Sequence, residues 1–163
     1  MHYTKHVVTQ IHKYTSNAYE LILIDNGSSD ETIGLLKSYR NDDNVTVIKN
    51  TENMGYAYAN NQGIQKAESE YLCFLNNDVL LYPDWDIDLL RPFSQYNDIG
   101  ATGPVTNNCA GVQCGDYTLQ NIGKESYSVI AKQRSKELAN NFREYHRIIG
   151  FCLMAKTQLI KEI

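Results

Sequence analysis

The chain has 163 residues and a formal net charge of −4. That length suits one folded domain with a substantial core. Its mild acidity argues against a nucleic-acid partner, which would need a basic patch. No apolar stretch is long enough to cross a membrane, and no run of Lys and Arg is typical of a membrane-surface anchor.

Strands and helices alternate along the predicted chain. The patterns predict a helix at residues 2–14, a strand at 20–25, a helix at 32–39, a strand at 45–48, a helix at 55–67, a strand at 71–75, a helix at 84–96 capped by Asp84, a strand at 99–105, a long loop at 106–126, a helix within 127–145, a strand at 148–154 and the start of a helix at 157–163. This order predicts an α/β fold with a mostly parallel sheet.

Two of the predicted strands end in segments that carry a carboxylate. Residues 20–25 run into the sequence DNGSSD (residues 25–30), and residues 71–75 run into Asn76-Asn77-Asp78. In open α/β sheets the carboxyl ends of the strands form the crevice where ligands bind. One acid flanked by amides suits a hard divalent cation, which prefers oxygen ligands.

Both segments also have an ordinary structural explanation. Asn and Asp are common in turns because their side chains bond the nearby backbone. Ser28, Ser29 or Asp30 can cap the helix that follows, and we favour that role for them. Asp25 precedes the turn and has no capping role, so it is the stronger candidate for contact with a ligand.

The four cysteines do not form a metal motif. Cys73 and Cys152 lie in apolar segments and are expected in the core. Cys109 and Cys114 lie in the long loop, without a Cys-x-x-Cys pair or a neighbouring His to complete a zinc site. We expect reduced thiols in a cytoplasmic protein, and a disulfide in the loop is the less favoured alternative.

The order and spacing of four segments resemble family-two glycosyltransferases of the GT-A fold, especially bacterial rhamnosyltransferase-like members. The segments are DNGSSD (25–30), NMGYAYANNQG (53–63), YLCFLNND (71–78) and GATGP (100–104). The resemblance covers nearly the whole chain. It implies a single domain over residues 1–163, built as a three-layer α/β sandwich around a mostly parallel sheet.

The resemblance also implies a site for a nucleotide sugar. Asp25 and Asn26 match the positions that contact the base. The segment beside the nucleotide is matched by Asn53, Gly55, Asn60 and Gly63. The family's D-x-D motif holds the ribose and a divalent metal; here it reads Asn76-Asn77-Asp78, so Asp78 is the expected ligand of Mg²⁺ or Mn²⁺, with Asn76 and Asn77 beside the nucleotide sugar.

The activity that the resemblance implies is transfer of a sugar from a UDP- or dTDP-linked donor to a hydroxyl of a glycan or glycolipid, in cell-surface polysaccharide or glycoconjugate synthesis. A metal at the diphosphate stabilises the leaving group, and a general base activates the acceptor. No residue matches the family's base, so the catalytic residue stays unknown, with Asp116 and Glu125 as the first candidates. A cytoplasmic location is expected, with peripheral binding at the inner membrane face as a variant of it.

The family pattern raises expectations about both ends of the chain. The family's first strand, which lies in the middle of its sheet, has no counterpart before residues 2–14. The family's general base follows the strand matched by residues 148–154, and the sequence reaches Ile163 without a match to it. We therefore expect a partial domain with unpaired strand edges and little sugar transfer by this chain alone. The alternative function is a non-catalytic remnant that binds a nucleotide or a partner. A nucleotidyltransferase is disfavoured because no Gly-rich basic phosphate loop is present.

Overall fold

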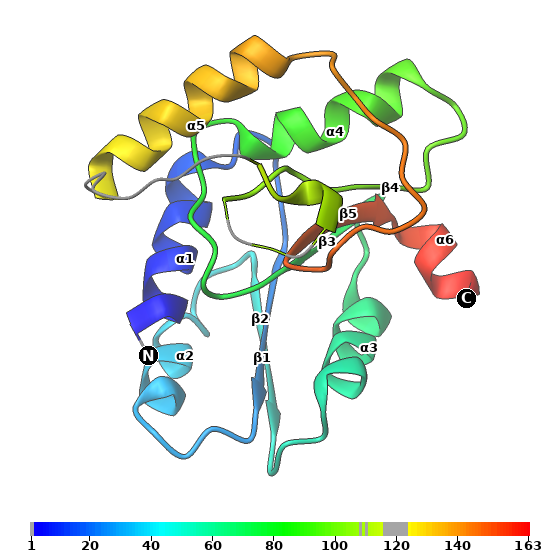
Figure 1. The fold of residues 1–163 in the computed structure, drawn as a ribbon. Coiled ribbons are helices and arrows are strands. Elements are labelled where there is room, and N and C mark those ends of the chain that lie inside the picture. Colours follow the sequence, from blue (N-terminus) through cyan, green and yellow to red (C-terminus); the bar gives the residue numbers. More distant parts are fainter. Residues whose placement is uncertain (1, 108, 110, 116–123) are drawn as a thin grey trace.

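The structure, a computed structural model, describes residues 2–107, 109, 111–115 and 124–163 (Figure 1). In chain order the elements are α1 (His2–Tyr14), β1 (Leu21–Asn26), α2 (Thr32–Ser38), β2 (Val45–Asn50), α3 (Tyr56–Lys66), β3 (Tyr71–Leu75), α4 (Trp85–Gln95), β4 (Ala101–Thr102), a 3₁₀ helix (Gly111–Gln113), α5 (Lys124–Leu138), β5 (Cys152–Lys156) and α6 (Thr157–Glu162). The predicted alternation of helices and strands is confirmed. In the part described, no helix is long and apolar enough to cross a bilayer.

The described strands form two sheets instead of one. β1 and β2 pair in parallel, from Leu21 opposite Val45 to the ends of both strands. β5 lies between β3 and β4 and runs antiparallel to both. The prediction of a mostly parallel sheet is therefore wrong for these strands, since only the β1–β2 pair is parallel. Among the described residues, no backbone hydrogen bond joins β1 to β3.

The direction of β5 follows from the route of the chain after α5. A parallel strand requires a crossover that returns the chain to the starting end of its neighbour. Here the chain arrives at the carboxyl end of β3 instead, where the N–H of Asn76 donates to the carbonyl of Phe151 at 2.9 Å. β5 then runs back along β3, with Cys152 opposite Leu75.

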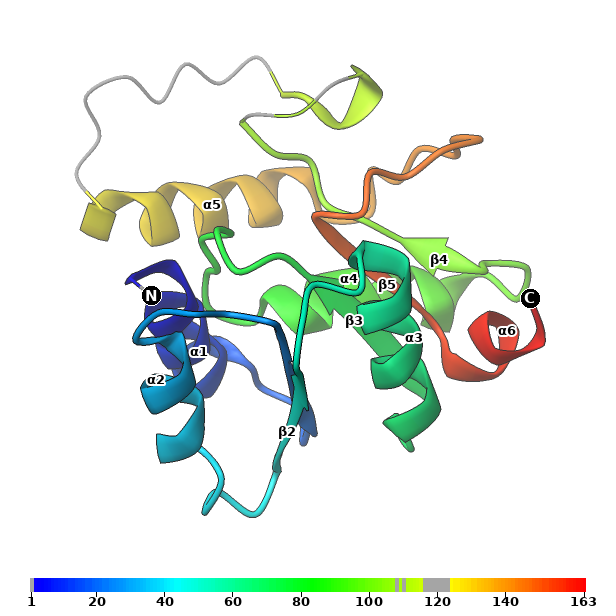
Figure 2. The same ribbon diagram turned by 90° about the horizontal axis from the view of Figure 1, so that it is seen from below.

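Helix α1 supplies the centre of the core. Its apolar residues recur at helical spacing, and Val8 is completely buried. They pack with residues from the segment before α4, from α4 itself and from β5; the buried members of this core are Val7, Val8, Ile11, Leu81, Trp85, Leu89, Cys152 and Met154. On another side of the molecule, α3 lies beside β1 and α6 (Figure 2).

The segment that follows β3 runs along α1. Near the start of the helix, the side-chain amide of Asn77 donates to Oγ1 of Thr4 at 3.1 Å. At the other end, the N–H of Asp84 donates to the carbonyl of Tyr14 at 3.0 Å. α1 rises from the N-terminus in Figure 1, whereas β1 runs back down. Asn77 and its neighbour Asp78 therefore lie near the end of α1 toward which β1 runs.

The strand predicted at residues 99–105 is reduced to β4, Ala101–Thr102. Two residues explain the early end. Pro104 has no N–H to donate to a neighbouring strand. At Gly103 an added Cβ would lie 2.5 Å from Cγ2 of Ile148, so the chain is packed too closely there to carry a side chain.

Helix α5 starts and ends earlier than the sequence pattern predicted, over Lys124–Leu138. The backbone of Asn140 has a left-handed φ of 71°, and the N–H of Asn141 bonds the carbonyl of Leu138 at 2.8 Å. Asn is one of the few residues that adopt this conformation readily, so it ends a helix in the way glycine often does.

The predicted cap of α4 is also corrected. Asp84 occupies the position before the helix, but its φ of 64° is left-handed and its side chain makes no capping bond. The carboxylate instead accepts hydrogen bonds from Oγ of Ser16 and from Nζ of Lys132. Asp84 thus connects α4 to α5 and to the end of α1.

Glu20 ties the start of β1 to the turn before β3. Its Oε1 accepts hydrogen bonds from the N–H of Glu68 at 2.8 Å, and from the N–H and hydroxyl of Ser69 at 2.9 Å. Burial raises the pKa of Glu20, but the hydrogen bonds from Glu68 and Ser69 outweigh burial, so the net pKa is lowered. A carboxyl group with a lowered folded-state pKa stabilises the fold above its unfolded pKa and loses that contribution as the pH falls through the folded pKa.

A Glu20→Gln variant should therefore be less stable than the parent at neutral pH and close to it in acid. We expect the difference in the free energy of unfolding to shrink as the pH falls from about 7 to about 3, below the ordinary pKa of Glu. Urea unfolding of both proteins at the two pH values measures it. A difference that stays constant would contradict the role given to Glu20.

Candidate functional site

The turn after β1 presents a buried carboxylate. Asp25 is 3% exposed, and its Oδ1 accepts a hydrogen bond from the N–H of Ser28 at 2.9 Å. No other hydrogen bond to Asp25 occurs within the described ranges, which leaves Oδ2 without a partner. Asp30 has a different role, since its carboxylate bonds the N–H of Thr32 at the start of α2. The prediction that Ser28, Ser29 or Asp30 caps α2 is not met, because Glu31 occupies the position before the helix and makes no side-chain capping bond.

Gly27 allows this turn to pack directly on the loop before α3. Its φ is +83°, and an added Cβ would lie 2.5 Å from the carbonyl carbon of Glu52 and 2.7 Å from the backbone nitrogen of Asn53. Both atoms belong to the backbone and cannot rotate away. The turn after β1 and the loop that carries Asn53 are therefore in direct contact, as the nucleotide-site prediction requires.

Four side-chain amides join these two segments, and we call Asn26, Asn50, Asn53 and Gln62 the amide cluster. Asn26 donates to Oδ1 of Asn53 at 2.9 Å and to the carbonyl of Gly55 at 3.2 Å. Its own Oδ1 accepts from Nδ2 of Asn50 at 3.0 Å and from the N–H of Met54 at 3.1 Å. Asn50 and Gln62 form a reciprocal amide pair at 2.8 and 3.0 Å.

Asn50 and Gln62 were not among the residues predicted for the site. A sequence signal for Asn50 exists in retrospect: β1 and β2 both end in Asn, and the pairing register places Asn26 opposite Asn50. Gln62 has no comparable signal, because its place beside Asn50 depends on how α3 packs against the strands.

Other predicted residues on and before α3 have local roles in the structure. Gly55 precedes the helix with a φ of +86°, and its N–H donates to Oδ1 of Asn53 at 3.0 Å. Asn60 bonds the carbonyl of Tyr56 within the helix, at 2.9 Å. Gly63 is buried, and an added Cβ would lie 3.2 Å from Cδ1 of Ile24, so it allows α3 to approach β1. Asn53 and Gly55 thus join Asn26, whereas Asn60 and Gly63 shape the helix and its packing.

The segment Asn76-Asn77-Asp78 follows β3, and all three side chains are exposed. Asn77 is bonded to α1, as described above. The carboxylate of Asp78 makes no hydrogen bond or ion pair with any residue described in the structure. It is therefore available to a ligand.

The metal-ligating groups around Asp78 suit only a weakly bound metal ion. In the part of the chain that the structure describes, no three His, Cys, Asp or Glu side chains cluster in a way that could hold a metal ion. One carboxylate with neighbouring amide oxygens fits Mg²⁺ or Mn²⁺ if phosphate and water supply the remaining ligands. The candidate bases give no further information: Asp116 lies outside the described residues, and so does the side chain of Glu125 on α5.

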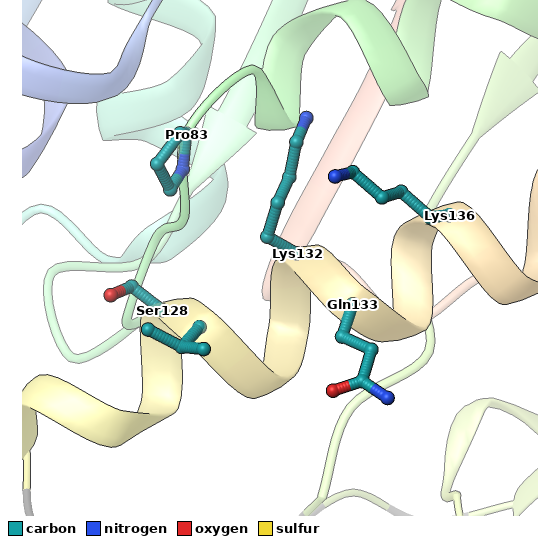
Figure 3. Close-up of a pocket in the computed structure, with 6 residues that line it drawn as sticks. Pro83, Ser128, Lys132, Gln133 and Lys136 are labelled. Atoms are coloured by element: carbon teal, nitrogen blue, oxygen red, sulfur yellow. The ribbon is translucent and has the colours of Figure 1, made fainter.

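A separate hollow of about 370 Å³ lies where α5 meets the segment before α4. Figure 3 shows Lys132 and Lys136 extending to one side of α5 and Gln133 to the other; the lining residues are Pro83, Ser128, Val129, Lys132, Gln133 and Lys136. Nζ of Lys132 lies 2.8 Å from Asp84, and this hydrogen bond lowers the pKa of the Asp84 carboxyl. None of the predicted nucleotide or metal residues lines the hollow.

Comparison with known proteins identifies the family. The profile of glycosyl transferase family 2 matches residues 2–163. The chain belongs to this family, which confirms the resemblance seen in its motifs. The family implies the GT-A type of α/β fold, to which the two described sheets and their helices correspond in part.

Curated relatives match shorter stretches of the chain. The putative glycosyltransferase EpsH of Bacillus subtilis (strain 168) is 26% identical over 97 residues, which is 60% of this chain and 28% of that protein. The uncharacterized glycosyltransferase YfnE of the same strain is 36% identical over 66 residues, or 40% of this chain and 17% of YfnE. A poly-beta-1,6-N-acetyl-D-glucosamine synthase of Staphylococcus aureus (strain COL) is 33% identical over 89 residues, or 55% of this chain and 21% of the synthase. The matched part thus spans less than a third of each relative's length.

Proposed function

We propose that this domain binds a nucleotide-diphosphate sugar between the turn after β1 and the segment after β3, and that it transfers the sugar to a hydroxyl of a glycan or glycolipid. The observation that carries the proposal is Asp25, a carboxylate that is 3% exposed, with one oxygen bonded to Ser28 and the other without a partner among the described residues. It lies beside a loop held in place by the amide cluster. We also propose a cytoplasmic location, where free thiols such as those of Cys73, Cys109, Cys114 and Cys152 stay reduced.

The chemistry of Asp25 suits a UDP or dTDP donor. An ionised carboxylate only accepts hydrogen bonds, and the imide N–H of uracil or thymine is a donor that it can bind. Hydrogen bonds to charged groups are about twice as strong as those between neutral groups, so this contact can select the base. Asn53 and Gly55 then border the nucleotide, with Asn60 one helical turn further on.

Asp78 is the residue proposed to contact the metal. When bound, Mg²⁺ or Mn²⁺ neutralises the charge that develops on the leaving diphosphate. In this proposal the carboxylate of Asp78 holds the metal, and the exposed Asn76 and Asn77 border the sugar diphosphate. The names of the relatives, which include a polysaccharide synthase, support an acceptor in polysaccharide synthesis.

A second candidate is a domain that binds the nucleotide or a partner without transferring sugar. Asp78 is the one carboxylate of the Asn76-Asn77-Asp78 segment, and no described residue has been identified as a general base. A general base contributes about a hundred- to ten-thousand-fold to the rate. An assay of sugar transfer with UDP- and dTDP-sugars separates the two functions, because the second predicts nucleotide binding without product.

Binding of UDP and dTDP with and without Mg²⁺ or Mn²⁺ tests the proposed site. We expect metal to increase the affinity of the parent protein, and Asp78→Asn to abolish that increase. Asp25→Asn should lower affinity about ten- to a hundredfold with and without metal, because it removes a hydrogen bond to a charged acceptor. Isothermal titration calorimetry measures both effects.

The matched control is Asp98→Asn, which changes an exposed acid in the connection between α4 and β4. Its affinities should equal those of the parent protein. If Asp78→Asn kept the full response to metal, Asp78 would not be the ligand. If Asp25→Asn bound both nucleotides as tightly as the parent, the site would lie elsewhere.

A further inference from the structure

We propose that Cys109 and Cys114 form a dithiol site that reacts with an oxidised low-molecular-weight thiol, such as glutathione disulfide, and closes into a reversible disulfide. Both thiols are free in the structure, and both lie between β4 and α5, outside the proposed donor site. The proposal therefore goes beyond the proposed function and does not depend on it. It agrees with a reducing compartment, because the disulfide forms when the oxidised thiol accumulates and is broken again by the reduced one.

The backbone holds the two ends of this part of the chain together. Thr106 forms a parallel bridge with Cys114. The N–H of Thr106 donates to the carbonyl of Gln113, and its carbonyl accepts from the N–H of Gly115, both at 2.8 Å. The loop is thus closed by hydrogen bonds before any disulfide forms. Most of the chain entropy that a cross-link would cost has already been lost.

A tight turn brings the two thiols to each other. The 3₁₀ helix Gly111–Gln113 lies directly before Cys114, and the N–H of Cys114 donates to the carbonyl of Gly111 at 3.1 Å. Cys109 lies two residues before this turn. Its side chain is hydrogen-bonded to that of Cys114. Thiols in hydrogen-bonding contact need only a small adjustment to reach the sulfur–sulfur distance of a disulfide, about 2.05 Å.

The two thiols differ in their access to a reagent. Cys114 is exposed, whereas Cys109 is half-buried. Burial and the neighbouring Cys114 raise the pKa of the Cys109 thiol. Since the thiolate is the attacking species and must be reached by the reagent, Cys114 is the thiol that reacts first and Cys109 the one that completes the disulfide.

Thiol–disulfide exchange accounts for every atom of the reaction. The Cys114 thiolate attacks one sulfur of glutathione disulfide, which forms a mixed disulfide and releases one glutathione thiolate. The Cys109 thiolate then attacks Sγ of Cys114 and releases the second glutathione. Two protein thiols are oxidised to one disulfide, one glutathione disulfide is reduced to two thiols, and the two protein protons pass to the released thiolates.

The residue before Cys114 connects the turn to the segment that leads into β5. Gln113 is 5% exposed, and its side-chain amide donates to the carbonyl of Pro104 at 2.9 Å. Its side-chain oxygen accepts a hydrogen bond from the N–H of Ile149. A disulfide across the turn restricts the motions that separate Gln113 from Ile149. Oxidation should therefore protect the N–H of Ile149 from exchange with water.

Cys73 and Cys152 form a second pair, which serves as a comparison within the same chain. Their side chains are hydrogen-bonded to each other, but Cys152 is only 2% exposed. The hydrogen bond with Cys73 and burial together raise the pKa of the Cys152 thiol. A reagent the size of glutathione disulfide has no access to this thiol in the folded protein. We expect the pair in the sheet to stay reduced while the pair in the loop reacts.

The test is treatment of the folded, reduced 163-residue chain with glutathione disulfide, followed by mass spectrometry of the intact protein and of its peptides. We expect a product that has lost two hydrogen atoms, with Cys109 linked to Cys114 and with Cys73 and Cys152 still free. Reduction by dithiothreitol should restore the original mass. Amide exchange at Ile149 should be about tenfold slower in the oxidised protein, because the disulfide restricts opening of the turn.

Single substitutions separate the roles of the two thiols. Cys109→Ser should accumulate a stable mixed disulfide of glutathione with Cys114, because the second thiol that would displace glutathione is gone. Cys114→Ser should react at least about tenfold more slowly than the parent, since only the half-buried thiol of the pair remains. Circular dichroism checks that both variants are folded, and the peptide map of the parent protein decides the linkage even if one variant is not.

Several results would overturn the proposal. One is a folded parent protein that keeps glutathione on Cys114 without forming the bond to Cys109. Another is oxidation of Cys73 and Cys152 as fast as that of the pair in the loop, because exposure would then not govern the reaction. A parent protein that does not react at all would overturn it as well. None of these measurements needs a nucleotide, so a failure of the proposed function would leave them unchanged.

Discussion

A Gly27→Ala variant is expected to lose about 3 kcal/mol of the free energy of unfolding, and its nucleotide affinity should fall below detection. The first cause is the backbone: a φ of +83° is unfavourable for alanine. The second is space, because the new Cβ would lie 2.5 Å from the carbonyl carbon of Glu52. Strain and overpacking each cost about 1–3 kcal/mol, and here they act on the same turn.

Gly55→Ala is the matched control for this substitution. Its φ of +86° is almost the same, but no heavy atom lies within 4 Å of the added Cβ. It should cost only the backbone strain, about 1–3 kcal/mol, because a φ of 86° with a ψ of 164° is a conformation found essentially only in glycine. Urea unfolding followed by circular dichroism gives both stabilities, and calorimetry with UDP gives the affinities. If both variants lost the same free energy of unfolding, the close contact of Gly27 with Glu52 and Asn53 would add no destabilisation of its own.

Local sequence patterns predicted the individual elements well. α1 and β3 have the predicted bounds, and the other helices and β2 overlap their predicted ranges. These elements depend on signals within a few residues, such as the apolar spacing of α1 or the unbroken apolar run of β3. β4 is shorter than predicted: Pro104 has no N–H to extend the ladder, and Gly103 lies against Ile148, which is distant in the sequence.

Strand pairing could not be predicted in the same way. The run of residues 71–75 is apolar on both faces, which fits a parallel strand and an antiparallel one equally well. The partner of β3 is decided by where the chain arrives after α5, and the bond between Asn76 and Phe151 marks that point. No local pattern in either segment encodes it.

For the candidate site, the sequence pattern predicted residues at strand ends. It did not predict Asn50 and Gln62, whose hydrogen bonds hold Asn26 in place. Asp25 and Asn26 stand at the end of an apolar run, which is a visible signal. Gln62 lies among other polar residues of α3 and is distinguished only by its contact with Asn50. The contacts proposed with the nucleotide and the metal remain predictions for the binding experiments above.

The start of α4 illustrates a related difficulty. The sequence predicted Asp84 as the capping residue, because it follows Pro83 and precedes the helix. The structure gives the larger role to Asp86, which is 4% exposed and lies within the first turn. Its partners, Ser16 and Asn17, are about seventy residues away in sequence, so its function could not be read from the residues around it.

An Asp86→Ala variant is therefore expected to lose about 3 kcal/mol of the free energy of unfolding. Oδ2 of Asp86 accepts bonds from the N–H of Asn17 at 2.9 Å and from its side-chain amide at 2.7 Å, and Oδ1 accepts one from the N–H of Ser16 at 3.1 Å. Alanine removes all of these bonds, and a hydrogen bond to a charged group contributes about 1.5–3 kcal/mol. Asp86→Asn should also destabilise, because its NH₂ group would face N–H donors.

Asp98→Ala, at an exposed acid, is the control and should change stability by less than about 0.5 kcal/mol. The position of Asp86 gives a second, independent expectation. Its bonds hold the chain just before β1, whereas Asp25 lies near the other end of that strand, about 20 Å away at the usual rise per residue. UDP affinity of the folded Asp86→Ala protein should therefore stay within about twofold of the parent, since distant sites act independently. If Asp86→Ala bound UDP much more weakly at a temperature where it is fully folded, the connection between α1 and β1 would have to be counted as part of the donor site.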